Sequence, residues 1–135
     1  MATTTIPEGF HDLLSFDNKC FAYLATIMPD GTPQVTPVWF DYVGGKIRIN
    51  TARGRVKDKN LRRNPNVAIA ISDPKNPYRY LQIRGKAGPA TEEGADDVIN
   101  RLAKKYIGQD VYPWKKPGEV RVTYDIEILS TQTMS

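Results

Sequence analysis

Alternating apolar and polar positions are clearest near the C-terminus of the chain. In residues 120–128 every apolar side chain falls on one face and every polar side chain on the other, which is the period of a strand with one buried face. Residues 46–51 alternate in the same way, whereas residues 19–27 are apolar on both faces, as in a strand that is covered on both sides. The predicted strands are residues 19–27, 34–42, 46–51, 67–72, 80–86 and 120–128.

Turn residues between the first strands predict how they connect. Asp30-Gly31 supplies the positive φ angles of a tight hairpin, and Gly44-Gly45 makes a second turn. The first half of the chain is therefore predicted to be a three-stranded meander. Pro37 lies inside its second strand and has no N–H to donate, which favours a sheet edge or a bulge where backbone groups remain available to a ligand.

Helical spacing occurs in three places. Residues 7–14 predict a short N-terminal helix, and a basic helix follows Gly54. Residues 91–94 predict a capped start for a helix to about Tyr106. Six strands with helices at their ends predict a mainly β protein, a closed or nearly closed antiparallel barrel, built as one domain over residues 1–135.

Composition supports the β class and excludes several functions. Ile and Val together number 20 against 7 Leu, and the only cysteine, Cys20, excludes an intrachain disulfide and a thiolate zinc site, so we expect no metal. Residues 1–7 lack the features of an export signal, and no apolar stretch approaches bilayer length. We therefore expect a cytoplasmic protein without a membrane partner. A net charge of +4 is too small by itself to indicate nucleic acid.

Candidate chemistry is concentrated in residues 50–63, where a predicted strand ends and a helix begins. Six cations stand there against one acid, Asp58. A helix N-terminus offers free N–H groups and the positive end of a dipole, and both favour a phosphate. Arg55 and Lys57 are placed to hold such a phosphate from two sides. The alternative is a basic helix that is merely solvated, but Asn50, Thr51 and Gly54 at the strand end favour a site.

Three sequence segments resemble one family. Residues 30–40 (DGTPQVTPVWF), 49–57 (INTARGRVK) and 60–65 (NLRRNP), together with Gly85, resemble the flavin/deazaflavin oxidoreductases of the pyridoxamine-phosphate-oxidase-like superfamily. The resemblance covers about residues 21–130 and is strongest to the branch that uses coenzyme F420, a deazaflavin with an acidic tail. It implies a six-stranded antiparallel split β-barrel with short flanking helices, the FMN-binding split barrel, and a homodimer with cofactor clefts at the subunit interface.

The resemblance also implies a set of cofactor-binding residues. Arg55 and Lys57 would hold the phosphate, with Asn60 as a weaker candidate on that side. The strand end at 50–52 would border the ring system, and residues 36–38 would present backbone groups to its other edge. The cofactor-binding residues so implied are Thr36, Pro37, Val38, Asn50, Thr51, Ala52, Arg55, Val56, Lys57 and Asn60, with Gln82 and Trp114 as weaker candidates. An acidic tail would meet the remaining cations, Arg53, Lys59, Arg62 and Arg63.

The expected reaction is hydride transfer between reduced deazaflavin and a small conjugated acceptor, because no Ser-His-Asp set or paired-carboxylate motif indicates hydrolysis. No catalytic residue can be named from the sequence. Three alternatives stay open: an FMN-dependent oxidase or reductase, a non-catalytic cofactor or tetrapyrrole binder, and a small nucleic-acid-binding barrel. The last is disfavoured because no strand interleaves aromatic and basic residues. A homodimer is also expected because residues 21–27 are apolar on two faces.

Overall fold

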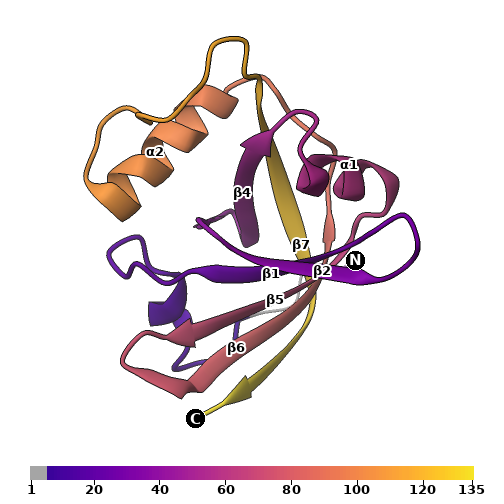
Figure 1. The fold of residues 1–135 in the computed structure, drawn as a ribbon. Helices are drawn as coiled ribbons and strands as arrows, with labels where there is room; N and C mark the ends of the chain where they lie inside the picture. The colour runs from indigo at the N-terminus through magenta and orange to yellow at the C-terminus, as the bar shows by residue number, and fades with distance from the viewer. Residues whose placement is uncertain (1–5) are drawn as a thin grey trace.

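Branched apolar residues at alternate positions form one seven-stranded antiparallel sheet in the computed structural model, which describes residues 6–135 (Figure 1). Residues 1–5, part of the segment expected to lack an export signal, lie outside the described residues. The elements are, in order, η1 (His11–Leu14), β1 (Ala22–Ile27), β2 (Pro33–Val38), β3 (Asp41–Val43), β4 (Lys46–Ala52), α1 (Val56–Arg63), β5 (Asn66–Asp73), β6 (Asn76–Ala87), α2 (Ala95–Ile107) and β7 (Arg121–Met134).

The strand order shows how the sheet closes. It runs β2-β1-β5-β6-β7-β4-β3, so β2 and β3 lie at opposite edges of the sheet. Only Trp39 and Phe40 separate these two edge strands in the sequence. A sheet whose two edges are joined by two residues must curl round on itself. The result is a split barrel, which confirms the predicted mainly β fold class.

The predicted three-stranded meander is wrong. The segment expected to be one strand, residues 34–42, divides into β2, which pairs with β1, and β3, which pairs with β4. This division is why the sheet has seven strands where six were expected. Pro37 does lie in an edge strand, opposite Tyr23, as its missing N–H requires.

Side chains of α2 hold the chain where it divides. The N–H of Phe40 donates to the hydroxyl of Tyr106 over 3.3 Å, and Nζ of Lys105 donates to the carbonyl of Phe40 over 3.0 Å. The Tyr106 hydroxyl also donates to the carbonyl of Cys20. Burial lowers the pKa of Lys105. The N–H and carbonyl of Phe40, which would otherwise pair with a neighbouring strand, are thus hydrogen-bonded to side chains of α2.

The core fills the inside of the barrel, and α2 covers part of its outside. Leu24, Ile69 and Ile126 are fully buried within it. Alternation in β7 is confirmed for its apolar face, but Arg121 and Thr123 on the opposite face are buried as well. They are buried because α2 and the segments flanking it pack over this part of the sheet (Figure 1).

Several element ends differ from the prediction. The expected helix over residues 7–14 is only the short 3-10 turn η1, and β7 continues to Met134 instead of ending at Ile128. Helix α2 starts at Ala95 after Gly94 in the left-handed conformation, with no side-chain cap. Thr91, expected to cap it, pairs instead with Thr123 of β7. Neither helix of the described residues is long and apolar enough to span a bilayer.

Candidate functional site

A tight turn leads from β4 into α1, and a buried carboxylate fixes it. Gly54 has φ +88°, which glycine adopts without strain, and its N–H donates to Oδ2 of Asp58 over 2.9 Å. Asp58 also accepts bonds from the Tyr124 hydroxyl at 2.6 Å and from Nε of Arg62 at 2.9 Å. Burial alone would raise the pKa of Asp58, but these hydrogen bonds together lower it. The N–H of Gly54 is therefore used internally and is not free for a phosphate.

An open cavity of about 310 Å³ lies beside this turn. It is formed by the ends of β2 and β4, the start of α1, the start of β7, helix α2 and the segment after α2. Six of the residues predicted to bind a cofactor line it. The lining residues are Pro37, Val38, Trp39, Asn50, Thr51, Arg55, Lys57, Ile99, Tyr112, Trp114 and Arg121. We refer to it as the α1 cavity.

Lys57 connects the two sides of the α1 cavity. Its Nζ donates to Oγ1 of Thr36 on β2 over 2.9 Å, so Thr36 joins the site through this bond. Burial lowers the pKa of Lys57, and the neighbouring Arg55 lowers it further. An anion bound here would oppose both effects, because it favours the charged form of lysine.

Arg55 has an ion-pair partner that is distant in the sequence. Its guanidinium lies 3.1 Å from Oε1 of Glu119, whose side chain is only 8% exposed. Oε2 of Glu119 also accepts a bond from Arg121 over 3.2 Å. One carboxylate therefore holds an exposed arginine and a buried arginine at the same cavity. Nothing in the local sequence around Arg55 indicates this pair, because Glu119 lies 64 residues later.

Asn50 is engaged within the chain. Its Nδ2 donates to the carbonyl of Ala95 over 2.9 Å and to Oγ1 of Thr123 over 3.2 Å, while its Oδ1 accepts from Nε of Arg121 over 2.8 Å. These bonds tie β4 to α2 and orient the Arg121 guanidinium. Asn50 thus lines the cavity as a residue that positions Arg121.

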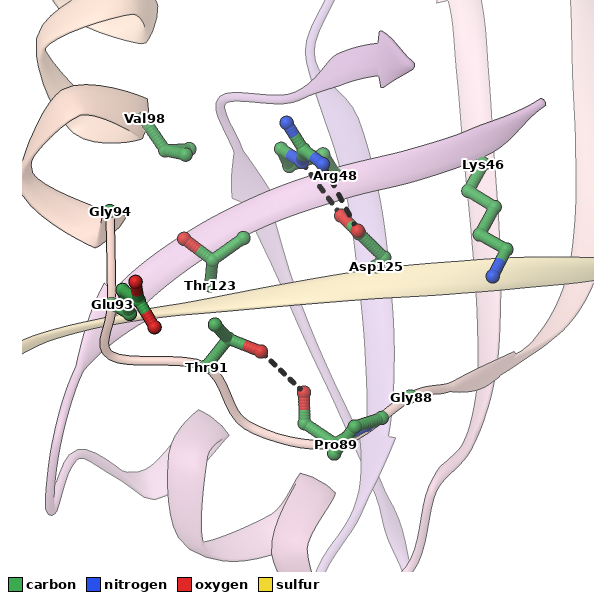
Figure 2. Close-up of a pocket in the computed structure, with 10 residues that line it drawn as sticks. All are labelled: Lys46, Arg48, Gly88, Pro89, Thr91, Glu93, Gly94, Val98, Thr123 and Asp125. Atoms are coloured by element: carbon green, nitrogen blue, oxygen red, sulfur yellow. Dashed lines mark hydrogen bonds and ion pairs between the residues drawn. The ribbon is translucent and has the colours of Figure 1, made fainter. Parts of the chain in front are cut away.

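A second cavity, of about 400 Å³, lies further along β4 and β7. Figure 2 shows Arg48 and Asp125 joined across the two strands, and the bonds measure 2.8 and 3.1 Å. Lys46 and Glu93 add one charge of each sign to the lining. The charges therefore balance in this cavity, whereas cations prevail in the α1 cavity.

Aromatic rings line part of the α1 cavity, next to one of its cations. Trp39 stacks on Tyr106 with centroids 5.3 Å apart and planes 6° apart, and the edge of Tyr112 meets Trp39 at 6.1 Å. Trp114 is 58% exposed and contacts both Trp39 and Tyr112. The Arg121 guanidinium lies over the Tyr112 ring at 5.1 Å. The cavity thus combines three cations, Arg55, Lys57 and Arg121, which we call its cationic end, with planar aromatic rings.

The remaining predicted residues differ in their place. Thr51 lines the cavity although it is only 2% exposed, whereas Ala52, at 4% exposed, and Val56, half exposed on the first turn of α1, do not line it. Asn60 is fully buried, and its amide donates to Oγ1 of Thr26 over 3.0 Å and to Sδ of Met28. The structure therefore gives Asn60 the task of attaching α1 to β1. Gln82 is exposed on β6 and does not line the cavity.

Residues missed by the sequence reasoning are Trp39, Ile99, Glu119 and Arg121. A signal for Trp39 existed, since it directly follows the predicted stretch 36–38. Arg121 pairs in register with Ala52 of the predicted strand end, but that pairing needs the sheet order, which the sequence does not state.

Most of the cations assigned to an acidic tail already have partners. Arg53 pairs with Glu92, Arg62 with Asp58, and Arg63 donates to Oδ1 of Asn60 over 2.7 Å. Lys59 is exposed and has no side-chain partner within residues 6–135. The excess of free positive charge is therefore smaller than the sequence suggests.

The sequence profile of the family described as pyridoxamine 5'-phosphate oxidase matches residues 13–129. A solved structure named F420 reductase is 32% identical, with a TM-score of 0.81, and the match covers 94% of this chain and 98% of that one.

Two further structures share the fold. A conserved hypothetical protein from Mycobacterium tuberculosis is 25% identical with a TM-score of 0.72, over 100% of this chain and 88% of that one. HupZ of Group A Streptococcus is 19% identical with a TM-score of 0.68, over 96% of this chain and 94% of that one, and shows likeness of fold alone.

Proposed function

Because the chain belongs to the pyridoxamine 5'-phosphate oxidase family, whose members bind flavin or deazaflavin cofactors, we propose that it is an oxidoreductase that depends on coenzyme F420. The reaction is hydride transfer between the reduced deazaflavin and a small conjugated acceptor. The observation that carries this proposal is the α1 cavity, where Arg55 and Lys57 share the lining with the aromatic rings of Trp39, Tyr112 and Trp114.

The donor set of the α1 cavity suits such a cofactor. Arg55 offers a planar fork and Lys57 a compact charge to the oxygens of a phosphodiester. Pro37 and Val38 offer apolar surface and backbone groups to a planar ring. Pro37 offers only its carbonyl, because proline has no backbone N–H. The start of α1 adds N–H groups that have no partner within the helix.

When bound, the cofactor supplies the hydride chemistry. The chain supplies binding, orientation and a low-polarity wall. Trp39 and Tyr112 exclude water from one side of the cavity. Arg121, fixed by Asn50 and Glu119, places a permanent positive charge at the cavity floor, where it stabilises negative charge on a bound ring or acceptor.

The support for F420 over FMN is twofold. The solved structure named F420 reductase is 32% identical along almost the whole chain. Lys59 is exposed on α1 about one helical turn after Arg55, and it has no side-chain partner within residues 6–135, so it can meet an acidic tail.

A homodimer is part of the proposal. The α1 cavity, at about 310 Å³, lies near the lower end of the range of small-molecule sites, so a second wall would complete it. The outer face of β1 and β2 is apolar, with Tyr23 46% and Val35 63% exposed. An apolar hollow on this side includes Ala25, Ile27 and Ala68. A second copy of the chain is the occupant we assign to this face, and a monomer in light scattering at micromolar concentration would contradict it.

Parallel fluorescence titrations with coenzyme F420 and FMN test the cofactor. We expect tighter binding of F420, followed by oxidation of the reduced deazaflavin when a conjugated enone is added. FMN binding that is equal or tighter, and that survives purification, would instead favour the FMN-dependent oxidase or reductase. Tight binding of the cofactor without turnover with any acceptor would favour the alternative that the protein is a non-catalytic cofactor or tetrapyrrole binder.

A further inference from the structure

Glu119 is an anion built into the cationic end of the α1 cavity. Its side chain is 8% exposed and its two oxygens accept bonds from Arg55 and Arg121, at 3.1 and 3.2 Å. Both arginines and Lys57 line the cavity. Three cations and one carboxylate give this end a net charge of +2, where the cations alone would give +3.

This carboxylate acts differently on singly and doubly charged phosphates. The attraction between a phosphate and the cationic end rises in proportion to the phosphate charge. The cost of removing an ion from water rises more steeply, with the square of the charge in the Born description that underlies the penalty for buried ions. Glu119 lowers the charge of the cationic end by one unit. A dianion then loses more attraction to the site than a monoanion does, while the desolvation cost of each ligand stays the same.

We propose that Glu119 is a specificity-determining residue that makes the α1 cavity favour phosphodiesters over phosphomonoesters. A diester carries a single negative charge, whereas a monoester approaches two at neutral pH because its second pKa is about 6. Glu119 also competes for Arg55, so a ligand phosphate shares that guanidinium with it. The inference rests on the proposed flavin or deazaflavin site and names what selects among its ligands.

Two flavin ligands with the same ring system test the proposal. FMN is a phosphomonoester and riboflavin cyclic phosphate is a phosphodiester. Fluorescence titrations would give the ratio of their dissociation constants for the wild type and for Glu119→Gln, which keeps the size of the side chain, removes its charge and can accept a bond from only one of the two arginines. At about pH 8 we expect the variant to shift this ratio toward FMN by about tenfold, from one unit of charge at short range in partly screened surroundings. At about pH 5.5, where the monoester is mostly singly charged, we expect a shift of less than about threefold.

Glu92→Gln is the matched control. It removes the same charge and also breaks a carboxylate–arginine pair, but Glu92 binds Arg53 and does not line the α1 cavity. We expect it to leave the ratio unchanged. A Glu119→Gln ratio within twofold of the wild type at the higher pH would overturn the proposal, as would an equal shift in the control.

If Glu119→Gln does not fold, the wild type still tests the discrimination between phosphate charges on which the role of Glu119 depends. The affinity of the wild type for FMN should then tighten relative to the cyclic ester as the pH falls from about 8 to about 5.5, because the monoester gains a proton. Constant or weakening relative affinity would overturn the proposal. Failure of the site itself looks different, because neither flavin ligand would then bind.

Discussion

Replacing Arg55 and Lys57 together by alanine tests whether they serve the ligand or the fold. The Arg55–Glu119 pair is half exposed on the arginine side, and such pairs contribute about 0 to 1 kcal/mol. Glu119 retains Arg121 as a partner. The Lys57–Thr36 bond contributes about 0.5 to 1.5 kcal/mol. We therefore expect the free energy of unfolding to fall by less than about 2.5 kcal/mol.

The effect on binding should be larger. Each charge-assisted hydrogen bond to a phosphate is worth roughly 1.5 to 3 kcal/mol, so losing one from each side chain predicts a loss of about a hundredfold or more in affinity. Fluorescence titration measures the affinity, and denaturant unfolding of the empty protein measures the stability. Wild-type affinity should also weaken with added salt, and the double variant should respond to salt less.

A charge-matched control is Lys19→Ala with Lys75→Ala, since both lysines are exposed and lie outside the α1 cavity. It should change the affinity by less than about threefold, as screened charges at a distance do. The phosphate site lies elsewhere if the double alanine variant binds the cofactor as tightly as the wild type does. The same conclusion follows if this variant does not fold in the absence of the cofactor.

Three further predictions concern pH and packing. Burial lowers the pKa of Lys57, and a bound anion raises it. The affinity for the cofactor should therefore be full below the pKa of Lys57 and should be lost as the pH rises through it, which binding titrations at several pH values would measure. Lys57→Arg should move this loss of affinity to higher pH. Asn60→Ala should lower the unfolding free energy by about 1 to 3 kcal/mol, because it leaves Thr26 without its buried donor; an unchanged denaturation midpoint would contradict this. Gly85→Ala should reduce the yield of folded protein, because the new Cβ would lie 2.7 Å from the carbonyl oxygen of Glu127, and a thermal unfolding transition equal to that of the wild type would refute the clash.

The strands were predictable wherever one face is buried against the core. The predicted strand 46–51 corresponds closely to β4, and the apolar side chains of residues 122–128 form the face of β7 that packs into the core. The division of residues 34–42 was not predictable, because both halves remain extended. What separates them is the engagement of Phe40 by Tyr106, 66 positions later, and a local pattern carries no record of such a contact.

The cationic end of the site was predictable in part. Arg55 and Lys57 follow a strand end within one segment, so their place in the cavity could be inferred from local spacing. Glu119 and Arg121 could not, because they reach the cavity only through the pairing of β4 with β7. The internal bonds of Asn50 were not predictable for a similar reason, since the carbonyl of Ala95 to which it donates belongs to α2.

The contact between α2 and Phe40 has a consequence for how this fold can diversify. Neighbouring strands in a ladder keep a spacing of about 4.8 Å, so a cavity bounded by paired strands has a width that the backbone fixes. Here β2 and β3 do not pair, and Tyr106 and Lys105 hold the chain between them instead. The width of the opening beside Trp39 therefore depends on the lengths of side chains on α2. Substitutions in α2 can widen or narrow this opening while every strand keeps its partners.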